Sequence, residues 1–396
     1  MKLLCVIPSY YPASRYGGPI ASLRALNNAL VEKGIDVTVY TTNVGLDQKV
    51  LPNHETNFEG VKVTYFTFTK FFEFMGTTGW QFSWPMTKTL KKKLKAFDLI
   101  YIVSVWNYPT VATAHYCKHY RKPYIISPQG ALYPYTARKK FWKKVPYYHI
   151  AVKRALQGAT AVHYLTRDEA EKCHRLLCLK NRAIVIPNGI DISEFNNLPE
   201  REKLRKRYPY LQDKKVILFL GRIHWIKGLD ILSKAYGRLA RKRNDVHLLI
   251  AGVDEDGCEK KLREWLKHEG VFDQVTFAGM VEGREKLEVF TGSDLFALPS
   301  YSEGFSMAIL EAMICGLPVI ITNHCNFLDV ERAKAGFIIQ PRDEDLYQAF
   351  ARILDNKKEA FQMGLRGKKL VKGCYNIDNI ADAVICKFQE ILRNEK

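Results

Sequence analysis

Short apolar runs alternate along the chain with longer stretches whose apolar residues recur at helical spacing. The runs are continuously apolar, which is typical of parallel strands buried on both faces of a sheet. The stretches between them predict amphipathic helices, for example over residues 20–33, 229–242 and 306–315. The predicted strands are residues 3–7, 37–41, 99–103, 124–127, 161–165, 183–186, 216–220, 247–251, 275–278, 295–298 and 319–322. This alternation predicts an α/β protein whose parallel sheets are covered by helices.

The alternation restarts once, near the middle of the chain. A strand ends in the Asn-Gly turn of Pro187-Asn188-Gly189, a charged stretch follows, and a new strand begins at Val216. We therefore expect a domain boundary within residues 187–213. The two halves are predicted to be doubly wound domains, with a ligand site in a cleft between them.

The composition is that of a globular protein with an uneven charge. Hydrophobic residues make up 47% of the 396 residues, which excludes disordered and collagen-like chains. The formal net charge is +19. Residues 1–190 hold 27 Lys and Arg against 10 Asp and Glu, whereas residues 191–396 hold 33 against 31. The excess in the first half indicates an anionic partner there, either nucleic acid or an acidic membrane surface.

Cysteine usage and apolar run lengths bear on the compartment. The nine cysteines form no CxxC pair, which favours a reducing environment and excludes a disulfide scaffold. No apolar run approaches the ~20 residues of a transmembrane helix, and the run at Leu3–Ile7 stops at Pro8. We expect a cytoplasmic protein that can rest on a membrane.

Two carboxylates eight residues apart form the strongest candidate site. Glu303 precedes a helix that we expect to begin near Phe305 and to end at Gly316, and Glu311 lies about two turns inside it. Both could reach one extended ligand, and the free N–H groups around residues 304–307 would face a phosphate. The alternative is that Glu303 only stabilises the helix start and that Glu311 is solvated or ion-paired. Against it, Glu311 sits in an apolar stretch and needs a partner or a ligand.

Two further loops follow predicted strands. Arg222 and Lys227 bracket a short loop after residues 216–220. The guanidinium of an arginine can bind two phosphate oxygens at once and the ammonium of a lysine adds a compact charge, so the pair suits a diphosphate. The alternative for both is solvation at the surface. Gly17 and Gly18 follow the first strand and allow a ligand close to the backbone, although the sequence lacks the GxGxxG dinucleotide motif. Alone, this Gly-Gly pair also fits an ordinary tight loop.

In order and spacing, these motifs resemble the family 4 glycosyltransferases of the GT-B fold, also known as glycosyl transferases group 1. The resemblance covers nearly the whole chain and rests on the Gly-Gly loop, Asn188-Gly189-Ile190-Asp191, Gly221-Arg222 with Lys227-Gly228, and Glu303 with Glu311. It implies two Rossmann-like domains facing across a cleft. The implied domains are an acceptor-side domain over residues 1–187, a nucleotide-sugar domain over 188–375, and a helix over 376–396 that packs back on the first domain.

The resemblance also implies roles. Arg222 and Lys227 would hold the donor diphosphate, Glu303 the transferred sugar, and Glu311 the ribose hydroxyls. The family retains anomeric configuration and uses no metal, so the resemblance implies no cofactor. It also implies that the catalytic residues are Arg222, Lys227 and Glu303. The donor substrate would be a UDP- or GDP-sugar. The implied donor-binding residues are Gly17, Gly18, Arg222, Lys227, Glu303, Gly304, Phe305, Ser306, Met307 and Glu311.

The chain departs from the family on the acceptor side. Many members carry a His in a loop of the first domain near the sugar, but residues 127–132 and 102–107 contain none. Gln129 is the candidate in its place, and it can hydrogen-bond but not titrate. Two acidic triplets, 254–256 and 343–345, look like the metal motif of the other glycosyltransferase fold. Because each sits at a helix start, we interpret them as helix-capping acids and expect no metal site.

Aromatic and basic residues are interleaved in the first half. Residues 65–84 hold nine aromatics, and clusters of lysine and arginine follow at 88–95 and 138–144. This mixture suits an anionic lipid surface, whereas core aromatics with solvated lysines, or a single-stranded nucleic acid site, are the alternatives. We favour the membrane, because the sugar-transfer motifs imply a glycan or lipid-linked acceptor, and do not expect nucleic acid.

The sequence thus predicts a retaining, metal-independent glycosyltransferase that moves a sugar from a nucleotide donor to a hydroxyl of a glycan or lipid-linked acceptor in surface polysaccharide biosynthesis. The alternatives are another GT-B enzyme, such as a nucleotide-sugar epimerase or a phosphorylase, and a non-catalytic basic binding protein. The nucleotide base, the sugar and the acceptor are not specified by these motifs.

Overall fold

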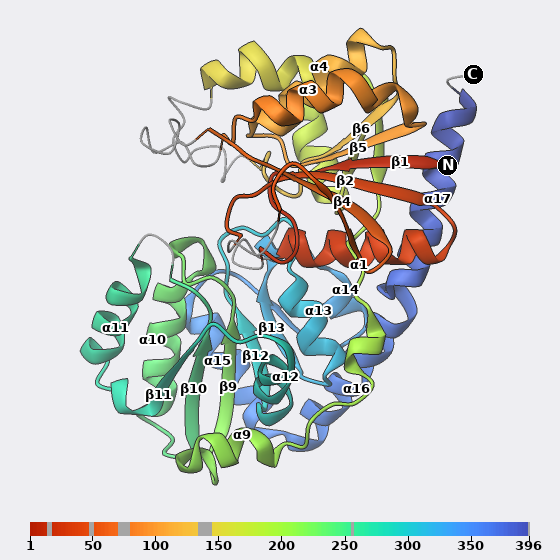
Figure 1. The fold of residues 1–396 in the computed structure, drawn as a ribbon. Coiled ribbons are helices and arrows are strands. Elements are labelled where there is room, and N and C mark those ends of the chain that lie inside the picture. The colour runs from red at the N-terminus through yellow and green to blue at the C-terminus, as the bar shows by residue number, and fades with distance from the viewer. Residues whose placement is uncertain (14–17, 47–50, 70–79, 134–144, 255–256, 395–396) are drawn as a thin grey trace. The chain divides into compact units, whose positions relative to one another are not determined.

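The computed structural model describes residues 1–13, 18–46, 51–69, 80–133, 145–254 and 257–394. The chain divides into two compact units (Figure 1). Unit 1 consists of Met1–Gly189 together with Ile377–Lys396, and unit 2 consists of Ile190–Asn376. The division at Gly189 lies beside the boundary that the Asn-Gly turn predicts.

Unit 1 is built on a sheet whose described strands run in the order β3-β4-β2-β1-β5-β6-β7-β8. Each pair is parallel except β3 with β4, which is antiparallel. Its strands are β1 (Lys2–Val6), β2 (Asp36–Thr42), β3 (Glu55–Phe58), β4 (Val61–Phe66), β5 (Leu99–Val103), β6 (Tyr124–Ser127), β7 (Ala161–Tyr164) and β8 (Arg182–Val185).

Helices cover both faces of this sheet. Its described α-helices are α1 (Gly18–Glu32), α3 (Trp84–Lys93), α4 (Tyr108–His119), α7 (Lys153–Gln157), α8 (Arg167–Glu169) and α17 (Ile377–Asn394). Successive side chains of a strand point to opposite faces. Accordingly Leu3 and Cys5 of β1 join the core beneath α1 and α17, whereas Leu4 joins the core beneath α3 and α4 (Figure 1). Both faces are therefore buried, as the continuously apolar strands require.

The C-terminal helix α17 belongs to unit 1 although the residues before it belong to unit 2. Ile380, Val384 and Phe388 are buried in the same core as residues of α1. At the helix surface Lys33 Nζ lies 2.8 Å from a carboxylate oxygen of Asp382. One face of α17 thus completes the hydrophobic core of unit 1.

Unit 2 has a six-stranded parallel sheet in the order β11-β10-β9-β12-β13-β14, the order of a doubly wound nucleotide-binding fold. Its strands are β9 (Lys215–Leu220), β10 (Val246–Ala251), β11 (Val275–Gly279), β12 (Leu295–Leu298), β13 (Val319–Thr322) and β14 (Gly336–Ile339). Its described α-helices are α9 (Glu202–Arg207), α10 (Leu229–Ala240), α11 (Cys258–His268), α12 (Gly283–Gly292), α13 (Met307–Ile314), α14 (Asp329–Arg332), α15 (Asp343–Asp355) and α16 (Lys357–Cys374).

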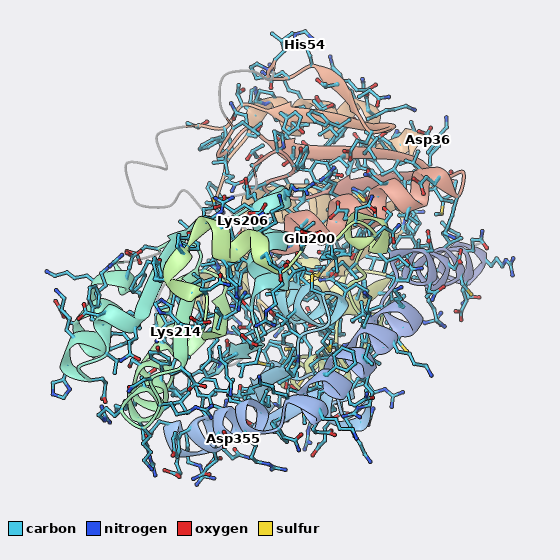
Figure 2. The ribbon with its side chains drawn as sticks, turned by 90° about the horizontal axis from the view of Figure 1, so that it is seen from below. Asp36, His54, Glu200, Lys206, Lys214 and Asp355 are labelled. Carbon is cyan, nitrogen blue, oxygen red and sulfur yellow. The ribbon has the colours of Figure 1, made fainter. Side chains whose placement is uncertain are left out.

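One large core joins these helices to the sheet. Many charged side chains of these helices lie at the surface. Figure 2 shows Lys206 of α9 and Asp355 of α15 on the outside of unit 2. Within the described residues no helix combines the length and apolarity needed to cross a membrane.

The structure places part of the aromatic run of the first half in the core. Tyr65 and Phe66 lie in β4 and are buried, so they are core residues. Residues 70–79 of the run and the basic residues 138–144 lie outside the described residues. Among the described aromatic residues of the run, Trp84 at the start of α3 faces solvent and is 56% exposed.

Candidate functional site

The site in unit 2 forms where two central strands end side by side. Strands β9 and β12 pair in parallel, so the loops that follow them leave the same edge of the sheet. The strand order also reverses between these two strands, and ligands bind doubly wound sheets at such a point. The β9 loop carries Arg222 and Lys227, and the β12 loop carries Glu303. The fold therefore brings Lys227 and Glu303 together, with Arg222 in the same loop as Lys227.

Lys227 and Glu303 form a direct ion pair. Lys227 Nζ lies 2.7 Å from Glu303 Oε1, and the side chains are only 12% and 10% exposed. The Ser300 hydroxyl donates to the same oxygen at 2.5 Å. Charge-assisted hydrogen bonds of this kind are short and directional. The Glu303 carboxylate is therefore held in one orientation before any ligand binds.

Close backbone contacts fix the two loops against each other. The Tyr301 N–H donates to the Ile226 carbonyl at 2.7 Å. Gly228 follows Lys227 in the left-handed conformation, with φ of 67°. A Cβ atom at Gly228 would lie 2.0 Å from the Pro299 carbonyl oxygen, so only glycine fits there. This close approach sets the spacing of Lys227 and Glu303.

Arg222 and Lys227 differ in their surroundings. Arg222 follows Gly221 at the end of β9 and its side chain is exposed, whereas Lys227 is largely buried. Lys227 ends a short 3-10 turn, Trp225–Lys227, directly before α10. An exposed guanidinium and a fixed ammonium beside a helix start suit a ligand that carries several negative oxygens.

The helix after Glu303 begins two residues later than expected. The helix α13 starts at Met307, and Ser306 is the residue before it, in extended conformation and without a side-chain cap hydrogen bond. Its first backbone N–H groups lack intrahelical acceptors, which is what makes a helix start attractive to anions. The Phe305 ring packs against Phe327 and Tyr375 at centroid distances of 5.4 and 6.0 Å. The ring of Phe305 is therefore engaged with the core of unit 2, and its backbone lies next to the start of α13.

Glu311 has a partner that the sequence did not reveal. Lys286 Nζ, from α12, lies 2.8 Å from Glu311 Oε1. The structure thus contains the ion pair that the alternative interpretation of Glu311 predicts. Lys286 sits in a charged stretch, Arg284-Glu285-Lys286, and no pattern there distinguishes it from a solvated lysine. Ser300 was likewise missed, because a lone serine after a strand carries no signal.

Of the residues predicted in unit 1, the structure describes Gly18 and Gln129. Gly18 is the first residue of α1, and Gly17 lies outside the described residues. Gln129 follows β6 with a φ of 53°. Its Nε2 donates to Ser127 Oγ at 3.0 Å, and its Oε1 accepts from Asn188 Nδ2 at 3.3 Å. The Gln129 amide is therefore engaged within unit 1, next to the turn that ends the unit.

A buried carboxylate supports the loop that carries Gln129. Glu169 is fully buried and accepts hydrogen bonds from the N–H groups of Gly130 at 2.7 Å and Leu165 at 2.9 Å. Burial raises the pKa of Glu169 to about 7, and the two N–H donors act in the opposite direction. The Thr166-x-x-Glu169 spacing is that of a capping box, which would predict only a local role. The structure instead shows this side chain tying two loops together.

The acidic triplets lie at helix starts. Asp254 Oδ1 accepts from the Glu259 N–H at 3.0 Å near the start of α11, and Asp343, Glu344 and Asp345 form the first turn of α15. Residues 255 and 256 lie outside the described residues. Across the described ranges, no three His, Cys, Asp or Glu side chains are grouped as a metal site would need.

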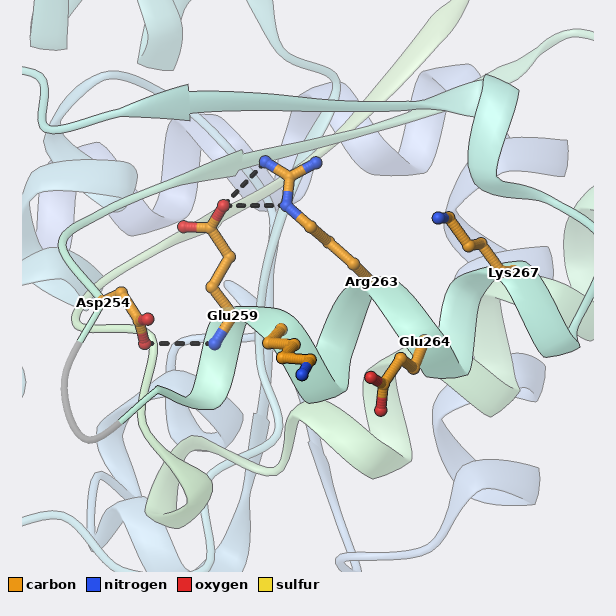
Figure 3. Close-up of a pocket in the computed structure, with 6 residues that line it drawn as sticks. Asp254, Glu259, Arg263, Glu264 and Lys267 are labelled. Atoms are coloured by element: carbon orange, nitrogen blue, oxygen red, sulfur yellow. Dashed lines mark hydrogen bonds and ion pairs between the residues drawn. The ribbon is translucent and has the colours of Figure 1, made fainter.

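A shallow groove runs along α11, and its charged residues interact with one another (Figure 3). Glu259 Oε1 accepts from Arg263 Nε at 2.8 Å, and the Arg263 guanidinium also stacks 3.8 Å from the Phe277 ring centroid. Its lining includes none of the residues singled out as donor-binding. We therefore assign the groove no part in the candidate site.

Two family models match successive halves of the chain. The model described as Glycosyl transferase 4-like domain matches residues 17–189, and the model described as Glycosyl transferases group 1 matches residues 200–370. The second match contains Arg222, Lys227, Glu303 and Glu311.

Similar proteins carry related descriptions. A glycosyltransferase of Methanocaldococcus jannaschii, itself uncharacterized, is 26% identical over 392 residues, which cover 95% of each chain. A GDP-mannose-dependent alpha-(1-6)-phosphatidylinositol monomannoside mannosyltransferase of Mycobacterium tuberculosis is 27% identical over 64% of this chain and 67% of its own. The matched segments of five further relatives span 34–47% of those proteins.

The fold is shared with solved structures. HepE of Anabaena, crystallised in complex with UDP-glucose, superposes with a TM-score of 0.78 over 98% of this chain and 100% of its own. The two sequences are 20% identical.

Proposed function

Because the chain belongs to the group 1 glycosyltransferases and has the GT-B fold, we propose that this enzyme moves a sugar from a UDP- or GDP-sugar to an acceptor hydroxyl with retention of anomeric configuration. The observation that carries the proposal is the Lys227–Glu303 ion pair at the carboxyl edge of β9 and β12. In this pair, the Lys227 ammonium can bind the diphosphate of the donor, and the Glu303 carboxylate can accept a hydrogen bond from a sugar hydroxyl. The HepE complex with UDP-glucose supports a nucleotide-sugar donor.

The transfer step follows from the charges at the site. The bond between the anomeric carbon and the diphosphate oxygen breaks, and the acceptor oxygen bonds to the same face of that carbon. The acceptor proton passes to the departing phosphate oxygen, so no side chain has to act as nucleophile. Arg222, Lys227 and the N–H groups at the start of α13 stabilise the charge that develops on the leaving diphosphate. With these groups in place the reaction needs neither a metal nor another cofactor.

The acceptor is a glycan or a lipid-linked saccharide of a surface polysaccharide pathway. The relative from Mycobacterium tuberculosis is named for transfer to a phosphatidylinositol monomannoside, which supports a lipid-linked acceptor. Unit 1 supplies the acceptor side, with Gln129 as the candidate contact. All nine cysteines are free, which supports action in the cytoplasm, at the inner face of the membrane.

Incubation with nucleotide-sugars tests the transfer itself. Thermal-shift screening over UDP- and GDP-sugars identifies the donor, and release of nucleoside diphosphate is then followed with and without acceptor glycolipids. We expect release to depend on acceptor and to continue in EDTA. Epimerised donor with no release would favour an epimerase, and phosphate-dependent formation of sugar phosphate would favour a phosphorylase. Activity lost in EDTA and restored by Mn²⁺ would contradict the metal-free mechanism.

The helix α3 presents a basic surface suited to an anionic membrane. Met86 and Leu90 are buried against the sheet, whereas Lys91, Lys92 and Lys93 are exposed. Trp84 at its start is 56% exposed, and Lys88 Nζ lies 5.8 Å from its ring centroid. An exposed tryptophan beside a row of lysines combines shallow insertion with attraction to anionic headgroups.

Replacing Lys91, Lys92 and Lys93 with glutamine is expected to weaken binding to phosphatidylglycerol vesicles by at least tenfold in 50 mM salt, since each lysine near the surface contributes about 1 kcal/mol. Vesicle co-sedimentation measures the change. The matched control replaces Lys260, Lys261 and Lys267 of α11, which are also exposed, and should bind as the parent does. Equal losses in both variants, or no binding by the parent, would contradict the α3 surface. Tight binding to single-stranded nucleic acid would favour the alternative partner.

A further inference from the structure

Lys286 and Glu311 come from neighbouring helices of unit 2 and meet at a partly buried position. Lys286 lies in α12 and Glu311 lies in the second turn of α13. Their contact is 2.8 Å long, and the side chains are 27% and 13% exposed. Glu311 shares its helix with Leu310 and Ala312, which are fully buried. A carboxylate in such a position is costly to bury unless it is paired and hydrogen-bonded, as Glu311 is here.

The charges around this pair favour the ionised form of Lys286. Burial alone would lower the pKa of Lys286, but the attraction and hydrogen bond of Glu311 raise it, with a further contribution from Glu194. Burial raises the pKa of the nearby Cys315 thiol to about 12, and Glu311 adds to that effect, so this thiol stays neutral. Lys286 is therefore the cation that faces Glu311 from α12, and Glu194 is the second anion near it.

The hydrogen bond occupies Oε1 of Glu311 and restrains the carboxylate. It leaves Oε2 available to accept hydrogen bonds from a ligand. Glu303 is held in the same manner, because Lys227 and Ser300 both bind its Oε1. The two carboxylates of the site are thus each anchored through one oxygen by a lysine from another element.

We propose that Lys286 is a positioning residue that orients Glu311 toward the ribose hydroxyls of the donor and so makes the enzyme discriminate ribonucleotides from 2′-deoxyribonucleotides. This inference rests on the proposed function, in which Glu311 binds ribose. If Lys286 served only the stability of unit 2, its removal would leave the preference for ribonucleotides over 2′-deoxyribonucleotides unchanged. The loss of stability would itself be small, because a partly exposed ion pair contributes little. A lysine that only attracted the diphosphate would change the affinity for both kinds of nucleotide equally.

Isothermal titration with UDP and 2′-deoxy-UDP, and with GDP and 2′-deoxy-GDP, measures this discrimination in the full-length protein. Using the base that binds more tightly, we expect the parent to prefer the ribonucleotide by about 10- to 100-fold, as for a hydrogen bond to a charged group. Lys286→Met should reduce the preference to about threefold or less, mainly by weakening ribonucleotide binding. Lys286→Arg should keep most of it. The control Lys234→Met, on the exposed side of α10, should leave it unchanged.

A Glu311→Gln arm separates failure of this inference from failure of the proposed function. Loss of the preference in Glu311→Gln together with its retention in Lys286→Met would overturn the positioning role and leave the ribose role of Glu311 intact. Three results would overturn both the positioning role of Lys286 and the ribose role of Glu311. They are a preference for the ribonucleotide that persists in Glu311→Gln, a parent that shows no such preference, and a parent that binds no nucleotide. An equal weakening of ribo- and deoxyribonucleotide binding in Lys286→Met would also overturn positioning, in favour of a general electrostatic effect. If Lys286 acts through Glu311, the double variant Lys286→Met, Glu311→Gln should lose no more of the preference for ribonucleotides than either single variant does.

Discussion

Replacing Lys227 with methionine is expected to lower the turnover number by about a thousandfold at saturating donor. The ammonium group sits beside Glu303 at the start of α10, where it would meet the charge that develops on the leaving diphosphate. Loss of one such preorganised donor from a water-poor site typically costs about 3–4 kcal/mol of transition-state stabilisation. Initial rates of nucleoside diphosphate release at saturating donor and acceptor measure the effect.

The same substitution also leaves the Glu303 carboxylate without its ammonium partner at 10% exposure, and this can destabilise unit 2. The double variant Lys227→Met, Glu303→Gln removes the unpaired charge. We expect it to recover the thermal midpoint and to stay inactive, which separates chemistry from folding. A Lys227→Met enzyme with parental turnover and only a raised KM would show that Lys227 binds donor and transition state equally, contrary to the proposed role.

Replacing Glu311 with alanine is expected to weaken donor binding by about 30- to 100-fold. Hydrogen bonds from ribose hydroxyls to a charged carboxylate contribute about 2–3 kcal/mol in total, which corresponds to that change. The variant should fold, because Lys286 is 27% exposed and can be solvated when its partner is removed. Calorimetric titration with the donor measures the affinity, and thermal denaturation checks the fold. A donor affinity equal to that of the parent would remove Glu311 from the ribose site.

The fold was largely predictable because buried parallel strands are continuous apolar runs. Strands β5, β6, β12 and β13 have the predicted bounds. Three strands, β3, β4 and β14, are not predicted from the sequence, and each has a physical reason. The edge strand β3 is polar and partly exposed, with the sequence Glu-Thr-Asn-Phe, and β4 interleaves Lys62 and Thr64 with its apolar residues. The last strand, β14, opens with a glycine and is half-buried.

The candidate site was predictable as single residues but not as pairs. Arg222, Lys227 and Glu303 could be selected because each follows an apolar strand, and strand order then determines which loops meet. The partner of a carboxylate is set by packing between distant segments. Glu303 and Lys227 are 76 positions apart, and Glu311 and Lys286 are 25 apart, with no local pattern linking them. The roles assigned to these residues stay predictions until the variants are measured.

On the ribosome, the N-terminal half of the chain cannot complete its core when its own residues have emerged. Ile380, Val384 and Phe388 of α17, which cover the same core as α1, are made only after the whole of unit 2. At ~5–20 residues per second, the roughly 200 intervening residues take about 10–40 s to synthesise. Unit 2 is complete before α17, whereas unit 1 carries an uncovered apolar face throughout that interval. A premature stop codon in place of the Ile377 codon would therefore damage unit 1, although most of unit 1 precedes it, and would leave unit 2 whole.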